Sequence, residues 1–235
     1  MKEFLLNNYA FLTVLFELLA AVSGSLYLRE KGKRIFRIFV YYLWLTVVIE
    51  ALGGYPKLMQ HNFDYEWFVF LKNSPFCSNT WLYNIYTLLS IGFIGVFYLN
   101  LLEKKINVFV IRLIIFLYTL FSVVYFTMTD AFFYHMLPYN DIIATVVIVI
   151  FAIFYLSELI RSEEILIYYK LPSFYITAGL LFWYLSVTPL FIFNEYHRAI
   201  NEYFNQFRHL LLLSINILTY SCFAFGFLYP LYKRK

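Results

Sequence analysis

The sequence predicts an all-α, polytopic transmembrane helical bundle of about seven spans, and two observations carry that prediction. Of the 235 residues, 63% are hydrophobic and only 14% are charged, whereas a soluble domain has about 45–50% apolar and about 25% charged residues. Seven apolar stretches also have the length of about 20 residues that a helix needs to cross the hydrocarbon core of a bilayer. None of them alternates apolar and polar residues with a period of two, so the pattern is not that of a membrane β-barrel.

The predicted spans follow one another along a single transmembrane domain that covers residues 1–235. Charged residues, Pro, Asn or Gly bound each of them. Two further segments, 63–72 and 158–172, are amphipathic and are predicted to lie along opposite membrane interfaces. The seven spans are predicted at residues 8–28, 35–55, 80–102, 106–127, 140–160, 173–194 and 208–230.

The first apolar stretch is interpreted as a retained helix and not as a signal peptide. The apolar segment from Tyr9 to Leu28 is longer than the apolar region of a signal peptide. A basic cluster follows at once, with Arg29, Lys31 and Lys33. An apolar stretch followed by positive charge is typical of a segment that stops transfer across the membrane.

The basic residues predict the orientation of the bundle. Most of the 18 Lys and Arg residues fall in the connections after the first, third and fifth spans and in the C-terminal tail. Because cytoplasmic connections carry an excess of Lys and Arg, the N-terminus is predicted outside and the C-terminus in the cytoplasm. Cys77 then lies in an outer loop and Cys222 in the inner half of the last span, so no disulfide bond is predicted.

Two carboxyl groups lie inside predicted spans, where an ionisable side chain is costly and needs a reason. Glu17 lies about nine residues into the first span, roughly 13 Å deep at about 1.5 Å per residue. Glu50 lies in the outer third of the second span. Both are expected to face the bundle interior. One interpretation is functional: the two carboxyl groups belong to a polar pocket, a proton relay or a cation site. The other is structural: they are protonated or hydrogen-bonded carboxyl groups that lock the packing of the helices.

Other polar residues are predicted at a similar depth. Asn84 lies near the outer end of the third span, Thr188 in the outer part of the sixth and Asn216 in the outer half of the seventh. Pro189 frees a backbone carbonyl one turn earlier and predicts a kink in the sixth span. Together with the two carboxyl groups, these residues are candidates for an outward-facing ligand or ion pocket. The alternative is that they form hydrogen bonds between helices, each worth about 0.6–2 kcal/mol.

The sequence predicts no metal site and no cofactor. The four histidines are spread over separate predicted outer segments, and no HxxxH or HExxH pair is present. The last span has no lysine that could hold retinal as a Schiff base. An enzyme is therefore the least favoured class of protein. The histidines are His61, His135, His197 and His209.

Several strings resemble an uncharacterised group of small seven-span inner-membrane proteins from Bacteroidetes-type bacteria. The resemblance covers most of the chain and implies a helical bundle in the inner (plasma) membrane. It implies no particular activity and no site residues. The strings that carry it are Tyr42-Leu-Trp-Leu-Thr-Val-Val-Ile-Glu50, Trp81-Leu-Tyr-Asn-Ile-Tyr86, Ser157-Glu-Leu-Ile-Arg-Ser162 and the segment 182–193 around Pro189.

Three functional hypotheses remain open from the sequence. The leading one is a receptor-like or accessory sensor module, with an outward-facing polar pocket and basic inner connections that contact a cytoplasmic or membrane protein partner. The second is a small transporter or channel that uses Glu17 and Glu50. The third is a membrane-embedded, metal-dependent hydrolase. In each case the lipid bilayer is the expected surrounding, nucleic acid is not an expected partner, and the oligomeric state is left open.

Overall fold

The computed structural model confirms the predicted fold class. Every regular element that it describes is helical. Seven of the helices in the described part of the chain are long and apolar enough to cross a membrane. The described residues are 5, 8–30, 34–56, 66–134, 138–197 and 202–232.

The helix boundaries follow the predicted spans closely, with one clear difference at the end of the chain. The last helix begins at Glu202, six residues before the predicted span, because its first polar turns continue the helix beyond the apolar segment. Pro138 and Pro172 each begin a helix, where the missing N–H of proline costs nothing. The spanning helices are α2 (Tyr9–Glu30), α3 (Arg37–Gly53), α6 (Thr80–Leu101), α7 (Lys105–Met128), α9 (Pro138–Arg161), α10 (Pro172–His197) and α11 (Glu202–Tyr232).

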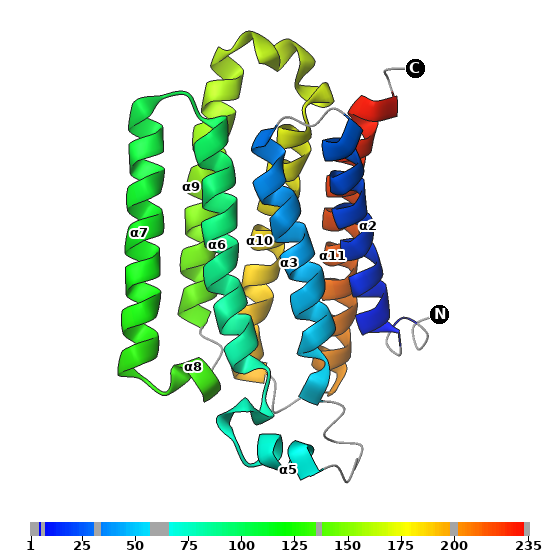
Figure 1. The fold of residues 1–235 in the computed structure, drawn as a ribbon, viewed down its shortest axis with the longest axis vertical. Helices are drawn as coiled ribbons and strands as arrows, with labels where there is room; N and C mark the ends of the chain where they lie inside the picture. Colours follow the sequence, from blue (N-terminus) through cyan, green and yellow to red (C-terminus); the bar gives the residue numbers. More distant parts are fainter. Residues whose placement is uncertain are drawn as a thin grey trace.

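Short elements mark the two ends of the bundle. At the end that holds the N-terminus lie α5 (Glu66–Lys72), η2 (Pro75–Cys77) and α8 (Ala131–Tyr134) (Figure 1). At the opposite end, beside the C-terminus, lies η3 (Glu163–Lys170). We refer to these as the α5 end and the η3 end. In the predicted orientation the α5 end is outside.

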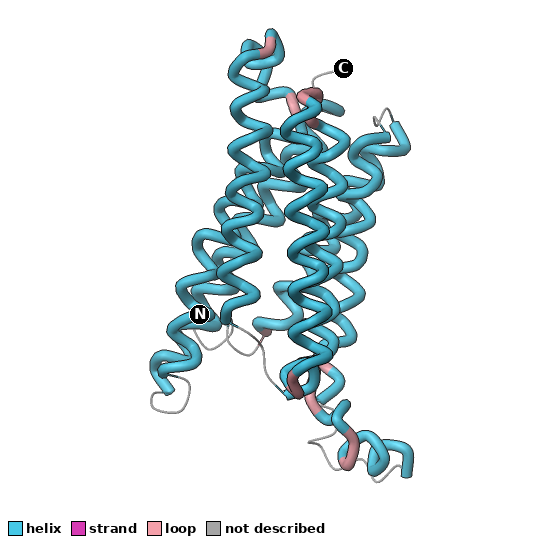
Figure 2. The backbone as a smooth tube through the Cα atoms, turned by 90° about the vertical axis from the view of Figure 1, so that its left-hand side faces the viewer, coloured by secondary structure: helices cyan, strands magenta, loops and turns pink. Residues whose placement is uncertain are grey.

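Six of the long helices form a closed ring, and α7 lies outside it. Around the ring each helix packs on the next in the order α6, α3, α2, α11, α10, α9, and α9 returns to α6. Helix α7 packs mainly on α6 and stands apart at one side of the bundle (Figure 1). Seen from the side, the helices run nearly parallel along the long axis (Figure 2).

The exterior of the bundle is apolar, as a lipid solvent requires. Large apolar side chains are exposed on every spanning helix, so water would face a nearly continuous oily surface. Helix α7 is the extreme case, because only Ile111, Tyr118 and Ser122 on it are buried. Exposed examples from the other spans are Leu19, Val48, Val96, Val146, Leu185 and Leu218.

The half of the bundle nearer the η3 end is filled by a group of aromatic rings that we call the phenylalanine cluster. Its members come from η1 (Arg34–Phe36) and from α3, α6 and α11. All are nearly or fully buried, and their ring centroids lie 5.2–6.4 Å apart in contacting pairs. The cluster consists of Phe36, Phe39, Phe97, Phe223 and Phe227.

Two glycines let helices approach closely around this cluster. A Cβ atom on Gly179 of α10 would lie 2.5 Å from the ring of Phe223 on α11. A Cβ atom on Gly24 of α2 would lie 2.8 Å from Val40 on α3. Small residues at such contacts are how membrane helices gain packing without a hydrophobic driving force.

Hydrogen bonds from polar side chains secure the connections at both ends. At the η3 end, the Glu158 carboxylate of α9 accepts bonds from the backbone N–H of Glu103, at 2.9 Å, and from the Asn107 side chain, at 2.6 Å. At the α5 end, the side-chain amide of Asn79 donates to the carbonyl of Gly53, at 2.7 Å. The ends of neighbouring helices are therefore tied together outside the apolar core.

The basic residues in the described part of the chain are concentrated at the η3 end. Of the described basic residues, only Lys72 and Arg208 lie toward the α5 end. The described Lys and Arg residues are thus distributed as the positive-inside rule expects for the predicted orientation. Both cysteines are free, as expected. The described basic residues at or near the η3 end are Arg29, Arg34, Arg37, Lys104, Lys105, Arg112, Arg161 and Lys170.

Candidate functional site

Glu17 is the most deeply buried carboxyl group of the described chain. It lies on α2, about 12 Å from the start of that helix at about 1.5 Å per residue, and only 2% of its surface is exposed. The Tyr220 hydroxyl of α11 lies beside it and can donate a hydrogen bond. Its Oε2 atom has no hydrogen-bond partner among the described residues. A buried carboxyl group with an oxygen atom that has no hydrogen-bond partner is a strong candidate to bind a ligand.

Glu50 belongs to the same group of side chains. It lies near the end of α3 and is half-buried, and the Tyr83 hydroxyl of α6 donates a hydrogen bond to its Oε2 atom at 3.2 Å. Glu17 and Glu50 interact electrostatically, and both act on Tyr9 of α2. The structure therefore brings together two of the five candidate residues, from neighbouring helices.

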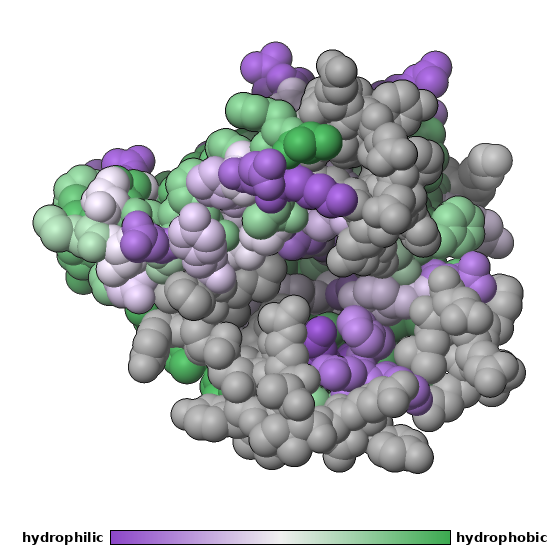
Figure 3. Space-filling view, turned by 90° about the horizontal axis from the view of Figure 1, so that it is seen from below, coloured by the Kyte–Doolittle hydropathy of each residue, from purple (hydrophilic) through white to green (hydrophobic). Residues whose placement is uncertain are grey.

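Basic groups of α11 adjoin this site on the side of the α5 end. Tyr9 interacts electrostatically with Arg208, and its ring meets that of His209 edge-on with centroids 5.2 Å apart. Seen from the α5 end, hydrophilic side chains gather near the middle of the molecular face (Figure 3). The polar site is thus nearer to the α5 end than to the η3 end.

A hydroxyl network continues inward from Glu50 along α3. Thr46, one turn before Glu50 and 2% exposed, shares a 2.9 Å hydrogen bond with the Tyr86 hydroxyl of α6. Thr46 also donates to the carbonyl of Tyr42, at 3.0 Å, and the Tyr42 and Tyr86 hydroxyls lie 3.4 Å apart. In a lipid surrounding, these side chains satisfy one another because no bulk water is present.

A small cavity lies on the other side of Tyr42. Its volume of about 10 Å³ is close to what one water molecule needs. Tyr42, Tyr184, Thr219 and Tyr220 line it together with Leu180, Trp183 and Phe223. Tyr220, which lies beside the Glu17 carboxyl group, therefore also lines a cavity with room for about one water molecule.

Asn216 stands at the edge of this region. Its side-chain oxygen accepts a 2.8 Å hydrogen bond from the indole of Trp183, which also lines the small cavity. Asn216 is one turn before Tyr220 on α11, and side chains with that spacing are neighbours on a helix surface. It therefore lies next to the group that contacts Glu17, with its own oxygen already engaged.

The other two candidates are engaged in hydrogen bonds to neighbouring elements. Asn84 of α6 donates to the carbonyl of Phe132, at 3.0 Å, which fastens α8 to the bundle. Thr188 of α10 shares a hydrogen bond with Thr145 of α9 and donates to the carbonyl of Tyr184 at 2.7 Å. Helix α10 continues through Pro189 to His197. Whether any of the five residues binds a ligand stays a prediction.

Sequence reasoning missed the hydroxyl groups that surround the carboxyl groups. One signal was available, because each glutamate stands four residues after a threonine, in Thr13-Val-Leu-Phe-Glu17 and Thr46-Val-Val-Ile-Glu50. That spacing places the two side chains of each pair on one face of a helix. The tyrosines carried no comparable signal, because 23 of them are spread along the chain.

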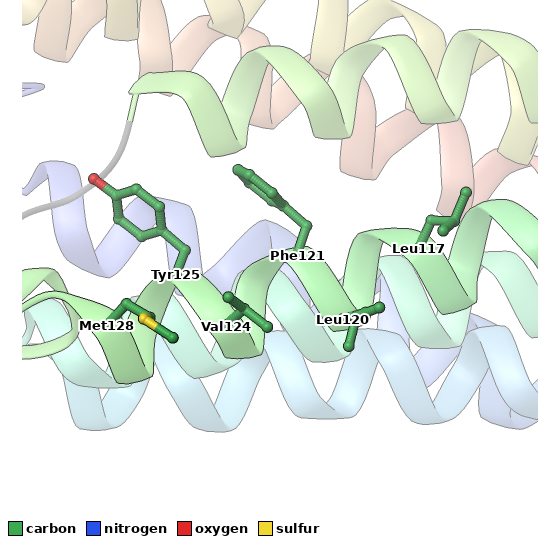
Figure 4. Close-up of a pocket in the computed structure, with 6 residues that line it drawn as sticks. All are labelled: Leu117, Leu120, Phe121, Val124, Tyr125 and Met128. Carbon is green, nitrogen blue, oxygen red and sulfur yellow. The ribbon is translucent and has the colours of Figure 1, made fainter.

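A second hollow lies elsewhere, on the lipid-facing side of α7. It measures about 540 Å³. All its lining residues come from this single helix (Figure 4), and none of them is charged. An apolar groove open to the bilayer is a place for lipid chains and offers no group for chemistry. Its lining residues are Leu117, Leu120, Phe121, Val124, Tyr125 and Met128.

Metal-binding groups and likeness to known proteins give no further guide to the site. The described residues contain no group of three or more His, Cys, Asp or Glu side chains that could hold a metal ion. His61 and His135 lie outside the described residues, as does the side chain of His197.

Comparison with protein-family models, with curated proteins and with solved structures gave no match. What the structure establishes is a seven-helix bundle suited to a membrane, in which two carboxyl groups of neighbouring helices belong to one group of polar side chains.

The Thr46–Tyr86 hydrogen bond predicts a measurable coupling between α3 and α6. Thr46→Val keeps the shape of the side chain but leaves the Tyr86 hydroxyl without its closest partner. We expect a loss of about 0.6–2 kcal/mol in the free energy of unfolding. Tyr86→Phe should cost a similar amount, and the double variant should cost less than the sum of the two.

The measurement is unfolding in lipid–detergent micelles by titration with a denaturing detergent. Thr127→Val is the matched control, because the Thr127 hydroxyl is exposed and bonds only to carbonyls of its own helix, at 3.0 Å. Strict additivity of Thr46→Val and Tyr86→Phe would show that the two hydroxyl groups do not interact.

Proposed function

We propose that this protein is a receptor-like sensor module of the plasma membrane, with a polar site that a small solute reaches from the α5 end. One observation carries the proposal. Among α2, α3, α6 and α11, the two carboxyl groups and the hydroxyl groups bonded to them lie nearer the α5 end, and the phenylalanine cluster fills the part nearer the η3 end. A polar site that is closed toward the η3 end is better suited to detect a solute than to let the solute cross the membrane.

The phenylalanine cluster weighs against a small transporter or channel. A path for an ion needs polar groups or water along its whole length, because ionisable species are costly in a dry apolar surrounding. Phe39 and Phe97 are fully buried, and Phe39 packs edge-on against Phe223 of α11 with ring centroids 5.2 Å apart. To open a path, rings from three helices would have to separate.

The helices that form the site also reach the opposite end of the bundle. The site joins α2, α3, α6 and α11, and the same helices carry the phenylalanine cluster at their other ends or pack on it. A ligand that is bound better in one arrangement of these helices than in another shifts the population between them. At the η3 end such a shift moves the surface around η3, where the Leu166 side chain is 78% exposed and is available to a protein partner.

The proposed orientation is tested by the two native cysteines. Cys77 is exposed in η2 at the α5 end, whereas Cys222 is half-buried inside α11. A membrane-impermeant maleimide added to intact cells should therefore label the native protein at Cys77. Labelling should disappear in Cys77→Ser and persist in Cys222→Ala.

Labelling that occurs only after the cells are broken open would place the α5 end in the cytoplasm and reverse the proposed direction of sensing. The readout is the mass of the purified protein, which shifts by one reagent for each labelled thiol.

The sensing role is tested with a fluorescent reporter at the η3 end. A variant with Cys77→Ser, Cys222→Ala and Leu166→Cys is labelled with an environment-sensitive dye and placed in lipid nanodiscs. Alkali salts, organic amines and small carboxylates are then added one at a time. At least one of them should change the dye emission in a saturable way, because the site and η3 belong to one packed bundle.

The response should be lost in Glu17→Gln and kept in Ser122→Ala. Ser122 is a matched control, because its hydroxyl is also buried without a partner among the described residues but lies on α7, outside the ring. A response that survives Glu17→Gln, or no response to any of these solutes, would contradict the proposed function.

A further inference from the structure

Three buried oxygen atoms near the site have no hydrogen-bond partner in the described part of the chain. They are Thr13 Oγ1 and Glu17 Oε2 on α2 and Thr219 Oγ1 on α11. Each of the three residues is at most 3% exposed. A buried polar group without a partner costs about 1–3 kcal/mol, and three of them on two packed helices indicate a ligand that occupies the space between them.

Thr13 and Glu17 lie on the same face of α2, because they are four residues apart. The contact between Gly24 and Val40 fixes how α2 and the antiparallel α3 are aligned. Counting from that contact toward the α5 end places Thr13 at the level of Glu50. The unpartnered oxygen of Thr13 therefore lies at the depth of the second carboxyl group, and Glu17 lies about one helical turn deeper.

Thr219 approaches from α11, the helix that α2 contacts most extensively. It lines the small cavity together with Tyr220, and Tyr220 lies beside the Glu17 carboxyl group. Tyr220 therefore links the Glu17 carboxyl group on α2 to the small cavity that Thr219 lines on α11. No sulfur atom and no imidazole lines the small cavity.

The chemistry of these atoms identifies the class of ligand. Oxygen atoms of carboxylates, hydroxyls and water bind hard cations, whereas Zn²⁺ and other borderline or soft metals prefer imidazole and thiolate groups. The adjacent cavity has room for about one water molecule. A small inorganic cation fits this space, and an organic amine does not.

Charge balance favours a monovalent cation. When both carboxyl groups are ionised, Glu17, Glu50 and the nearby Arg208 carry a formal charge of about minus one in total, and a dry site must be close to neutral. One monovalent cation neutralises it, whereas a divalent cation would leave a buried positive charge. Glu17 offers its unused oxygen atom, while Oε2 of Glu50 already accepts a bond from Tyr83.

We propose that Glu17, Thr13 and Thr219 form a binding site for a single dehydrated alkali cation of the size of Na⁺. The biological role of this cation site rests on the proposed function. If the protein is a sensor, the solute that it senses is an alkali cation. The binding itself can be measured without any assumption about signalling.

The test is direct binding of radioactive ²²Na⁺ to the full chain, purified and placed in nanodiscs with choline chloride as the background salt. We expect saturable binding of about one ion per chain. Glu17→Gln should weaken it at least about tenfold, which corresponds to about 1.4 kcal/mol. Thr13→Val, which keeps the shape of the side chain, should weaken it by a smaller factor, and Ser122→Ala should leave it unchanged.

Several outcomes would overturn the proposal. They are no saturable ²²Na⁺ binding, binding that Glu17→Gln and Thr13→Val leave unchanged, or displacement of ²²Na⁺ by Ca²⁺ or choline at lower concentration than by unlabelled Na⁺. If Glu17→Gln does not fold, Thr13→Val decides alone, against the Ser122→Ala control.

The dye at Leu166 separates the two proposals. Binding of ²²Na⁺ without a change in dye emission would support the cation site and contradict the sensing role. A saturable change with an organic solute, in a protein that does not bind ²²Na⁺, would contradict the cation site and support the sensing role.

Discussion

The constraint that governs this structure is the cost of placing carboxyl groups inside a bundle whose outer surface is in contact with lipid. Water cannot solvate Glu17 from outside, so any stabilisation has to come from neighbouring helices. Hydroxyl groups meet part of this need: Tyr220 of α11 lies beside Glu17, Tyr83 of α6 donates to Glu50, and Thr46 of α3 bonds to Tyr86 of α6. Three buried oxygen atoms of α2 and α11 remain without partners in the described chain. A fourth, on Ser122, stands alone on α7, so it is the grouping of unpartnered atoms beside a carboxyl group that distinguishes the site from the paired contacts of Asn84 and Thr188.

The division of the interior into two parts links the fold to the proposed function. Among α2, α3, α6 and α11, the carboxyl groups and their hydroxyl partners lie toward the α5 end, and close-packed aromatic rings lie toward the η3 end. In the proposed function the rings around Phe39 carry a displacement from one end to the other, because a packed core has few intermediate arrangements. A solute bound among α2, α3 and α11 would therefore change the opposite end through the helices themselves and would not have to cross the membrane. The apolar rings of Phe39, Phe97 and Phe223, which separate the carboxyl groups from the η3 end between α3, α6 and α11, are what favours a sensor over a transporter.

The sequence was sufficient to predict the seven spans because the thickness of a bilayer fixes their length and removes charge from their interior. Where prediction and structure differ, as at Glu202, the helix continues into polar residues that hydropathy does not detect. Glu17 and Glu50 could be selected for the same reason, since a carboxyl group within an apolar stretch is conspicuous. Their partners could not, because the face of a helix that meets another depends on the ring order of the bundle. Asn84 was selected by depth alone, and its actual neighbour, the carbonyl of Phe132, belongs to a short helix that no pattern indicated.

The central claim, that the polar site is closed toward the η3 end, is tested most directly by ion flux through the purified protein in sealed liposomes. With a sodium gradient and a membrane potential imposed, the account predicts that neither Na⁺ nor protons cross faster than in protein-free liposomes. Leakage of Na⁺ or protons should appear only after Phe39 of the phenylalanine cluster is replaced by alanine. A flux through the native protein that disappears in Glu17→Gln would contradict the account and identify the two carboxyl groups as part of a transport path.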